Sequence, residues 1–252
     1  MRVFAISDLH IDYAENRDWL FALSESDYTE DILILAGDIT DIMKLQIEAF
    51  EAVKKRFREV LFVVGNHDLW VMRDDAPDSL AKYSQLLTIA ADHGIRTEPY
   101  HLDSLSIVPL TAWYDYSFGK PSENLLKRWI DFSACKWPAG FDEEKITEYF
   151  LALNEPVLDI RNQFLITFSH FLPRIDLMPP FIPEKKRFIY PVLGSLKLDE
   201  QVRQLQPNIH VYGHSHVNTS DVVDNIWYIN NAFGYPSETR ITRKYLLQIY
   251  ET

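Results

Sequence analysis

Cysteine is almost absent from this sequence of 252 residues, which contains only Cys135. A single cysteine cannot form a disulfide within the chain, so the sequence fits a reducing compartment. Long apolar runs are also absent, since none approaches the ~18 residues that a membrane-spanning helix requires. The apolar stretch at residues 3–6 is short and soon meets Asp8, which is unlike a signal peptide. We therefore expect a cytoplasmic protein that does not cross a membrane.

Glycine is scarce as well: the chain has eight glycines, and the closest pair lies 19 positions apart. The phosphate-binding loops of P-loop proteins and of dinucleotide-binding folds need glycines only a few residues apart. Both kinds of nucleotide site are therefore excluded. The stretch Gly213-His214-Ser215-His216-Val217 comes nearest to a nucleophile elbow, but it lacks the second glycine of that motif.

Basic residues are outnumbered, because 25 lysines and arginines face 37 aspartates and glutamates and leave a net charge of -12. Nucleic-acid binding requires a basic surface, so a nucleic-acid partner is disfavoured, and so is an anionic membrane. Hydrophobic residues make up 47% of the chain and charged residues 25%, as is typical of a folded soluble domain. Since α/β domains of about 250 residues often fold as one unit, we expect residues 1–252 to form a single domain.

The first third of the chain alternates strand and helix patterns. Short apolar runs at residues 3–6, 32–36 and 61–64 are rich in β-branched residues and predict buried strands. Residues 45–57 carry apolar side chains at helical spacing, and a second helix is predicted from the N-cap Asp78 to Gly94. Strands separated by helices indicate parallel pairing.

The second half predicts further strands at residues 164–168 and 209–212, with a short helix at residues 198–205 before the latter. Residues 226–229 and 245–250 are interpreted as hairpin-like or meandering strands. Together these elements predict two packed sheets with helices outside, an α/β sandwich.

An aromatic-rich segment covers residues 111 to about 160. Its aromatic residues include Trp113, Tyr114, Tyr116, Phe118, Trp129, Phe132 and Trp137. One interpretation is an excursion that packs on the core, and it is slightly favoured for any single aromatic residue. The other is a cap that lines a pocket, since loops on a rigid scaffold often carry specificity.

Polar residues that could bind metal follow five of the predicted strands. They are Asp8 and His10, Asp38, Asn66 with His67 and Asp68, His170, and His214 with His216. Ligand sites of open α/β sheets lie at the carboxyl ends of strands, so we expect these residues to meet. Carboxylate, imidazole and amide groups together suit Mn, Fe or Zn rather than Ca or Mg. Because no thiolate joins them, a catalytic site with open positions is favoured over a structural zinc.

In chain order, the motifs Asp-x-His, Gly-Asp, Gly-Asn-His-Asp, His and Gly-His-x-His resemble the five motifs of the calcineurin-like metallophosphoesterases. They begin at Asp8, Gly37, Gly65, His170 and Gly213. The resemblance implies a four-layer α/β/β/α sandwich of two mixed sheets with flanking helices, holding two metal ions of Mn, Fe or Zn. The ligands it implies are Asp8, His10 and His216 for one metal, Asn66, His170 and His214 for the other, and Asp38 as the bridge between them.

The resemblance also implies a reaction, the hydrolysis of a phosphomonoester or phosphodiester of a small molecule by a metal-bridging hydroxide. Two metal ions can clamp the attacking and leaving oxygens and lower the pKa of a bound water. Local metal charge dominates over the acidic surface, so an anionic phosphate can still bind. His67 would act at the scissile phosphate as a proton donor or charge stabiliser. Its ring needs a partner that fixes its tautomer, and Asp41 and Asp68 are the candidates for this catalytic role. The alternative is that either aspartate is a solvated turn residue.

The sequence departs from the protein serine/threonine phosphatases of the family, which typically place a phosphate-binding arginine where this chain has Ile42 and a glutamate where it has Asp68. This disfavours a protein phosphatase and favours a small or phosphodiester substrate. Arg174, near His170 in the sequence, could replace the missing arginine, although a surface arginine is about as common.

Other candidates for the substrate site are weaker. Asn66 and His67 are expected to contact the substrate as well as to serve in the roles above. The turn at Gly234-Tyr235-Pro236 could come back toward the site, but a purely structural turn is the stronger interpretation.

Two other functional classes remain open. One is a binding scaffold of the same fold without catalysis, and the other is a mononuclear zinc amide hydrolase, for which the usual His-Glu-x-x-His helix is missing.

Overall fold

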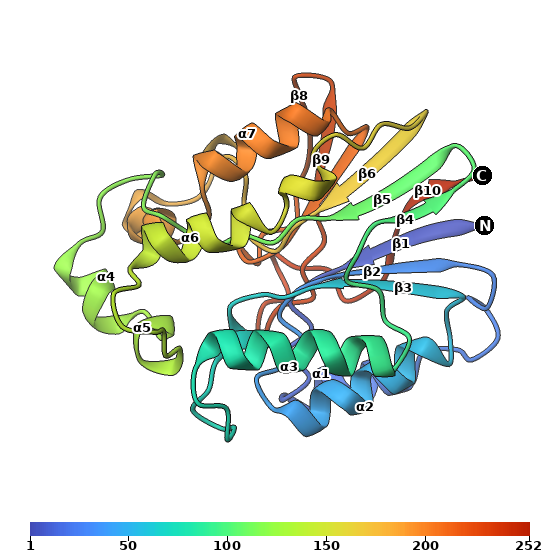
Figure 1. Cartoon of the computed structure of the whole chain (residues 1–252), viewed down its shortest axis with the longest axis horizontal. Coiled ribbons are helices and arrows are strands. Elements are labelled where there is room, and N and C mark those ends of the chain that lie inside the picture. The colour runs from blue at the N-terminus through green and yellow to red at the C-terminus, as the bar shows by residue number, and fades with distance from the viewer.

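Two β-sheets pack face to face at the centre of the molecule, as the computed structural model of residues 1–252 shows (Figure 1). In spatial order the four-stranded sheet contains β10 (Leu247–Glu251), β1 (Arg2–Ile6), β2 (Ile32–Ala36) and β3 (Glu59–Val63). The six-stranded sheet contains β4 (Tyr100–Leu102), β5 (Leu105–Pro109), β6 (Phe164–Phe168), β7 (Ile209–Tyr212), β9 (Ile226–Asn230) and β8 (Ser220–Val223). Strands β1 to β3 are parallel, as are β5, β6, β7 and β9, whereas β4, β8 and β10 are antiparallel to their neighbours.

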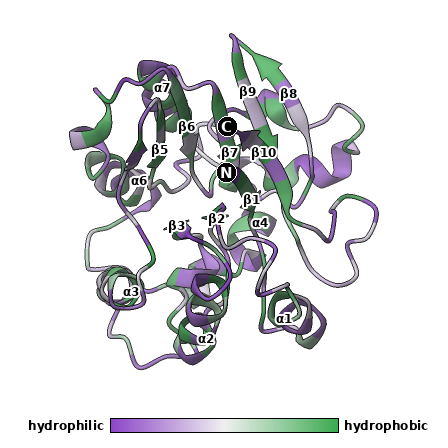
Figure 2. Cartoon of the chain, turned by 90° about the vertical axis from the view of Figure 1, so that its right-hand side faces the viewer, coloured by the Kyte–Doolittle hydropathy of each residue, from purple (hydrophilic) through white to green (hydrophobic).

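Helices cover the outer faces of both sheets. Figure 1 and the turned view of Figure 2 place α1 (Ala14–Phe21), α2 (Met43–Lys54) and α3 (Ser79–Asp92) on the four-stranded sheet, and α6 (Glu143–Ala152) and α7 (Leu196–Leu205) on the other. The short helices α4 (Glu123–Arg128) and α5 (Asp131–Ala134) lie at one end of the molecule (Figure 1). Four 3-10 helices complete the chain: η1 (His67–Leu69), η2 (Glu155–Val157), η3 (Ile175–Leu177) and η4 (Glu184–Val192). None of the helices combines the length and the apolar character that crossing a bilayer would need.

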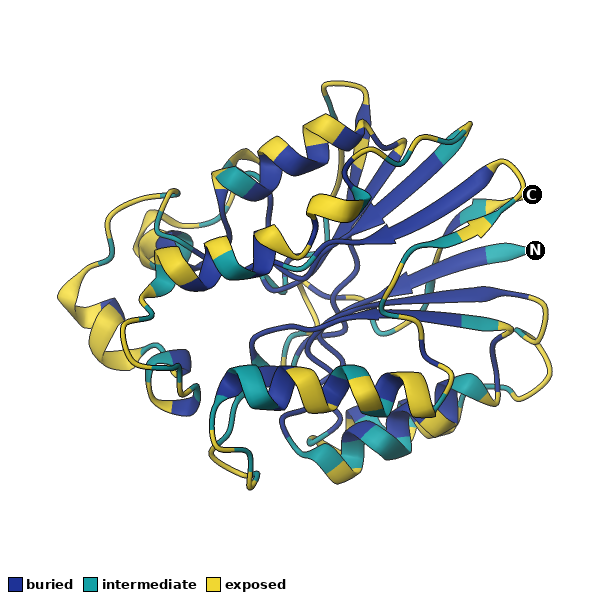
Figure 3. Ribbon diagram, viewed as in Figure 1, coloured by how far each residue is buried: buried dark blue, intermediate teal, exposed yellow.

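The central strands are mostly apolar because both of their faces are covered, whereas the edge strands β4, β8 and β10 are partly exposed (Figure 3). In β1, Val3 and Ala5 belong to the core between the sheets, whereas Phe4 and Ile6 belong to the core beneath the helices. Side chains alternate between the faces of a strand, so one run of apolar residues serves both cores. This explains why the strands read as continuous hydrophobic runs in the sequence.

The four-layer sandwich of two mixed sheets is confirmed. The predicted helix after Asp78 is present, and the Asp78 side chain accepts a hydrogen bond from the backbone of Ala81. The strands expected at residues 226–229 and 245–250 are present as β9 and β10, and β9 forms an antiparallel hairpin with β8. The hairpin-like expectation is wrong for β10, which crosses to the other sheet and pairs with β1. The sequence patterns did not predict α1, β4, β5 and β8: β4 has three residues, β8 is mostly exposed, and Ser106 interrupts the apolar run of the buried β5.

Candidate metal and active site

Five strand ends deliver the predicted ligands to one edge of the two sheets. Asp8 follows β1, Asp38 follows β2, Asn66 follows β3, His170 follows β6 and His214 follows β7. Within each sheet these strands are parallel, so their carboxyl ends open on the same side. All five side chains are buried, and Asp38, Asn66 and His214 line a pocket.

The first cluster of potential ligands consists of Asp8, His10, Asp38 and His216, whose donor atoms lie within 4.8 Å of one another. Nε2 of His216 is 3.1 Å from Oδ1 of Asp8 and 3.0 Å from Nε2 of His10. Nε2 of His10 in turn lies 4.0 Å from Oδ2 of Asp38. Four donors therefore converge from three separate loops.

The second cluster shares Asp38 with the first and adds His170 and His214. Nε2 of His170 lies 3.4 Å from Oδ2 of Asp38 and 3.2 Å from Nδ1 of His214. The same nitrogen lies 3.1 Å from Oδ1 of Asn66. Metal ligands held at about 2.0–2.2 Å from one ion are about 3–3.5 Å from each other, so these separations suit a shared ion.

Hydrogen bonds fix which ring nitrogens face the second cluster. Nδ1 of His170 donates to the backbone oxygen of Ala36 at 2.9 Å, and Nε2 of His214 donates to that of Val192 at 2.9 Å. In the neutral rings Nε2 of His170 and Nδ1 of His214 therefore carry lone pairs, which point at each other and at Oδ1 of Asn66. Converging lone pairs repel unless a cation lies among them, which is the environment that a metal ion requires.

The charge balance leads to the same conclusion. Burial disfavours the charged form of His170, but the neighbouring Asp38 outweighs it and raises the pKa of His170 to about 9. In the first cluster burial again opposes the charge, while Asp8 and then Glu238 raise the pKa of His216 to about 10. These carboxylates thus attract positive charge into the clusters, and metal ions can provide it in place of protons.

The backbone at the ligands is unusual. Asp8, His10, Asp38, His214 and His216 all have φ between 43° and 65°, the left-handed region that few residues other than glycine adopt. Such conformations cost free energy and concentrate at functional sites, where the surrounding structure enforces them.

Two motif glycines are required by close packing at the ligands. A Cβ atom at Gly65 would lie 2.1 Å from Oδ1 of Asp38, and one at Gly213 would lie 2.7 Å from Oδ2 of Asp8. The glycine of one motif therefore makes room for the carboxylate of another. This is a physical reason for glycine at those two positions.

His67 lies at the edge of the pocket rather than inside either cluster. Its ring stacks on Trp70 with 3.6 Å between the ring centroids, and its Nε2 is 3.9 Å from Oδ2 of Asp38. The backbone N–H of His67 donates to Oδ1 of Asp38 at 2.9 Å. The side chain is thus positioned by an indole ring and by its own main chain.

Neither carboxylate considered as a partner for the His67 ring contacts it. Asp41 pairs with the guanidinium of Arg73. Asp68 accepts backbone N–H groups, among them those of Asp38 at 2.9 Å and Gly65 at 2.8 Å. Burial, reinforced by the charge of Asp38, raises the pKa of Asp68 to about 7. Asp68 therefore anchors the loop of Asp38 and does not orient His67.

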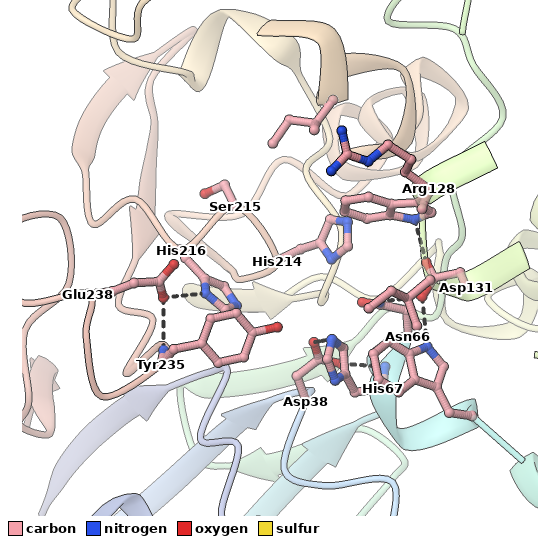
Figure 4. Close-up of a pocket in the computed structure, with 14 residues that line it drawn as sticks. Asp38, Asn66, His67, Arg128, Asp131, His214, Ser215, His216, Tyr235 and Glu238 are labelled. Atoms are coloured by element: carbon pink, nitrogen blue, oxygen red, sulfur yellow. Dashed lines mark hydrogen bonds and ion pairs between the residues drawn. The ribbon is translucent and has the colours of Figure 1, made fainter. Parts of the chain in front are cut away.

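The clusters open into a pocket of about 340 Å³ (Figure 4). Its lining beyond the ligands and His67 consists of Trp70, Arg128, Trp129, Ile130, Asp131, Ile189, Ser215, Tyr235 and Glu238. Arg128 is exposed and has no acidic partner, so the pocket contains an uncompensated cation. Arg174 is not part of the lining, because Asp176 and Asp224 bind its guanidinium at 2.8 and 2.7 Å.

The aromatic segment contributes a buried carboxylate that the sequence reading missed. Asp131 accepts hydrogen bonds from Nδ2 of Asn66 at 2.8 Å and from the indoles of Trp70 and Trp129, both at 2.7 Å. The bond to Asn66 turns the amide oxygen toward the second cluster. By contrast, Trp113 from the same segment is buried in the core.

The segment after β9 also reaches the site. Glu238 accepts a hydrogen bond from Nδ1 of His216 at 2.7 Å, which leaves Nε2 of that ring free for the first cluster. Tyr235 lines the pocket. The turn at residues 234–236 therefore does come back toward the site, which was the weaker of the two interpretations of its sequence. No sequence pattern marks Glu238, because its relation to His216 depends on the return of the chain.

Comparison with known proteins gives consistent matches along the chain. The sequence model of the calcineurin-like phosphoesterase family matches residues 1–218. The acyl-carrier-protein phosphodiesterase PptH of Mycobacterium tuberculosis is 25% identical over 269 residues, covering 96% of this chain and 81% of the relative. The uncharacterised protein L509 of Acanthamoeba polyphaga mimivirus is 25% identical over 258 residues, covering 92% of this chain and 91% of the viral protein. The crystal structure of the mycobacterial phosphopantetheinyl hydrolase PptH has the same fold, with a TM-score of 0.80 and 24% identity over 98% of this chain and 95% of that one.

Proposed function

Because this chain belongs to the calcineurin-like phosphoesterase family, a family of metal-dependent phosphoesterases, we propose that it hydrolyses a phosphodiester bond at two metal ions. The observation that carries the proposal is the pair of donor clusters that share Asp38. In three of the four histidines, hydrogen bonds outside the clusters direct a ring lone pair inward. In a purely structural cluster of polar residues, hydrogen-bond donors would pair with acceptors. In these clusters hydrogen-bond acceptors face other acceptors.

Each metal ion is assigned its own ligands. Asp8, His10 and His216 would hold the first ion, Asn66, His170 and His214 would hold the second, and Asp38 would contribute to both. Manganese, iron and zinc suit this mixture of imidazole, carboxylate and amide donors. When bound, such a pair polarises the phosphoryl group and lowers the pKa of the attacking water.

His67 is proposed to protonate the leaving oxygen. Its ring lines the pocket and is held by stacking on Trp70, while its nitrogens hydrogen-bond to no other side chain. Nε2 is therefore available to the substrate, and a proton released to the leaving group can be replaced from the solvent. Arg128 takes the role first considered for Arg174, since its guanidinium is free to bind an anionic group of the substrate.

The shape of the pocket favours a diester over a monoester. Trp129, Ile130 and Ile189 form an apolar wall beside the clusters, and a second ester substituent can pack against it. A pocket of about 340 Å³ falls within the range of small-molecule sites. The mycobacterial relative is named as a phosphodiesterase as well. A phosphopantetheinylated acyl-carrier protein is therefore the first physiological substrate to test, by following the mass of the intact carrier protein.

The proposal is tested on metal-free protein assayed before and after addition of Mn²⁺. Bis(p-nitrophenyl) phosphate serves as the diester and p-nitrophenyl phosphate as the monoester. We expect hydrolysis that depends on Mn²⁺, with the higher kcat/KM for the diester, and none by Asp38→Ala. Protein that holds two metal ions per chain yet cleaves neither ester would overturn the proposal.

A further inference from the structure

Tyr235 lies in the connection between β9 and β10, beyond residue 218, where the family match ends. Its ring packs among the histidines of the site, with centroid distances of 4.6 Å to His10, 4.8 Å to His216 and 6.5 Å to His67. Figure 4 shows the side chain on the opposite side of the pocket from Arg128. The ring therefore forms a wall of the space directly above the first cluster.

The main chain around Tyr235 is firmly held. The backbone N–H of Tyr235 donates to Oε2 of Glu238 at 2.8 Å, and this oxygen also accepts from His216. Nζ of Lys244 donates to the backbone oxygen of Tyr235 at 2.9 Å. Gly234 enters the turn with a φ of 67°, which favours glycine. The turn is thus attached to a ligand of the first cluster, and the phenol ring keeps its position relative to that cluster.

The hydroxyl group of Tyr235 is left without a protein partner. The phenol oxygens of Tyr114 and Tyr212, by comparison, hydrogen-bond to Asp131 and Thr219 at 3.2 and 2.9 Å. In Figure 4 the hydroxyl of Tyr235 points across the pocket toward the space above Asp38. A donor that is fixed in direction, unpaired within the protein and aimed at the reacting centre is available only to water or to the substrate.

We propose that Tyr235 is a catalytic residue whose phenol O–H donates a hydrogen bond to a non-bridging oxygen of the scissile phosphoryl group. This inference rests on the proposed phosphodiesterase function. Negative charge on the phosphoryl oxygens is redistributed as the leaving bond breaks, and a donor already in place stabilises that charge without reorganising. Tyr235 thereby complements His67, which serves the leaving oxygen from the other wall of the pocket.

The test is Tyr235→Phe, which keeps the ring and removes only the hydroxyl group. Loss of one fixed donor to a reacting oxygen lowers rates by about 100-fold, so we expect kcat/KM for bis(p-nitrophenyl) phosphate to fall by about 30- to 100-fold, mostly in kcat. The inhibition constant of orthovanadate should rise by a similar factor. Affinity for Mn²⁺ and the melting temperature should stay unchanged. Tyr13→Phe is the matched control, because Tyr13 is an exposed neighbour with 5.4 Å between the ring centroids.

Two results would overturn this role. A variant with kcat/KM and vanadate inhibition within about twofold of the wild type would show that the hydroxyl does not contact the phosphoryl group. A variant that loses Mn²⁺ would show that the phenol supports the ligands instead. Neither result is confused with failure of the proposed function, because that failure would appear as wild-type protein that binds Mn²⁺ but cleaves no diester.

Discussion

Replacing Asp131 with asparagine tests whether the aromatic segment positions the metal site. The two carboxylate oxygens accept four hydrogen bonds: Oδ1 from Asn66 and Trp70, and Oδ2 from Trp129 and Tyr114. An asparagine at this position keeps one oxygen and gains an NH2 group, which can only donate. Wherever that NH2 group points, it meets an indole N–H that has no other acceptor.

The expected cost follows from the better of the two amide orientations. With the NH2 group toward Tyr114 and Trp129, the phenol can turn to accept, and only the indole of Trp129 is left unpaired. A buried unpaired donor costs about 1–3 kcal/mol, and the remaining bonds lose the assistance of the charge. Burial disfavours the charged form of Asp131 and raises its pKa. Replacing the carboxylate with a neutral amide removes this unfavourable contribution and so offsets part of the loss. We expect a net loss of about 2–3 kcal/mol, or about 5–10 °C in melting temperature.

The same substitution should weaken metal binding, since the bond that orients the Asn66 oxygen loses strength. A change in such an orienting group lowers metal affinity by about 10- to 100-fold, and we expect the lower end. Calorimetric melting and titration with Mn²⁺ would measure both effects. Asp142→Asn is the matched control, because Asp142 caps α6 in the same segment and asparagine caps equally well. Melting and Mn²⁺ affinity equal to those of the wild type would refute the reasoning.

Further variants and conditions test other parts of the structure. His67→Ala should keep its metal content by elemental analysis and lose at least about 100-fold in kcat, whereas loss of metal would contradict a role outside the clusters. Arg128→Gln should raise KM for the diester about tenfold, against less than twofold for Lys127→Gln, whose side chain does not line the pocket. Removing metal that is present at about 100 times its dissociation constant should lower the melting temperature by about 5 °C or more, and an unchanged value would argue against metal sites in the folded protein. Burial opposes the charge of Asp31, but hydrogen bonds from Arg2 hold its pKa below the ordinary value. Its stabilisation is therefore complete above the unfolded pKa and is lost as the pH falls, so Asp31→Asn should cost about 1 kcal/mol in urea unfolding at pH 7 and less at pH 3.

The convergence of the candidate ligands could be predicted because each follows a strand with a clear apolar run. The main chain of a parallel sheet brings neighbouring strand ends to one edge whatever connects them, so His170 after β6 and His214 after β7 meet although 44 positions separate them. Asp38 and His170 follow strands of different sheets and meet because the two sheets pack face to face. Most strands buried on both faces were predicted for the same reason, although β5 (Leu105–Pro109), which is equally buried, was not. The polar edge strand β8 was not, since Ser220–Val223 is mostly exposed and carries no apolar run.

Residues that act from irregular segments could not be predicted. Arg174 is near His170 in the sequence, yet its loop turns away and two carboxylates bind the guanidinium. Arg128 lies far from every motif in the sequence but lines the pocket. The same holds for Asp131, whose four donors come from different parts of the chain. Such contacts depend on how connections fold over the scaffold, and no periodicity in the sequence records that.

The left-handed backbone at five of the candidate ligands sets stability against the proposed activity. Each such residue costs roughly 1 kcal/mol that a glycine at the same place would avoid. Selection for thermal resistance alone would therefore favour glycine at these positions, where relaxing the main chain means giving up a candidate metal-binding side chain. A thermostable derivative of this enzyme has to be sought elsewhere in the molecule, with turnover measured at every round.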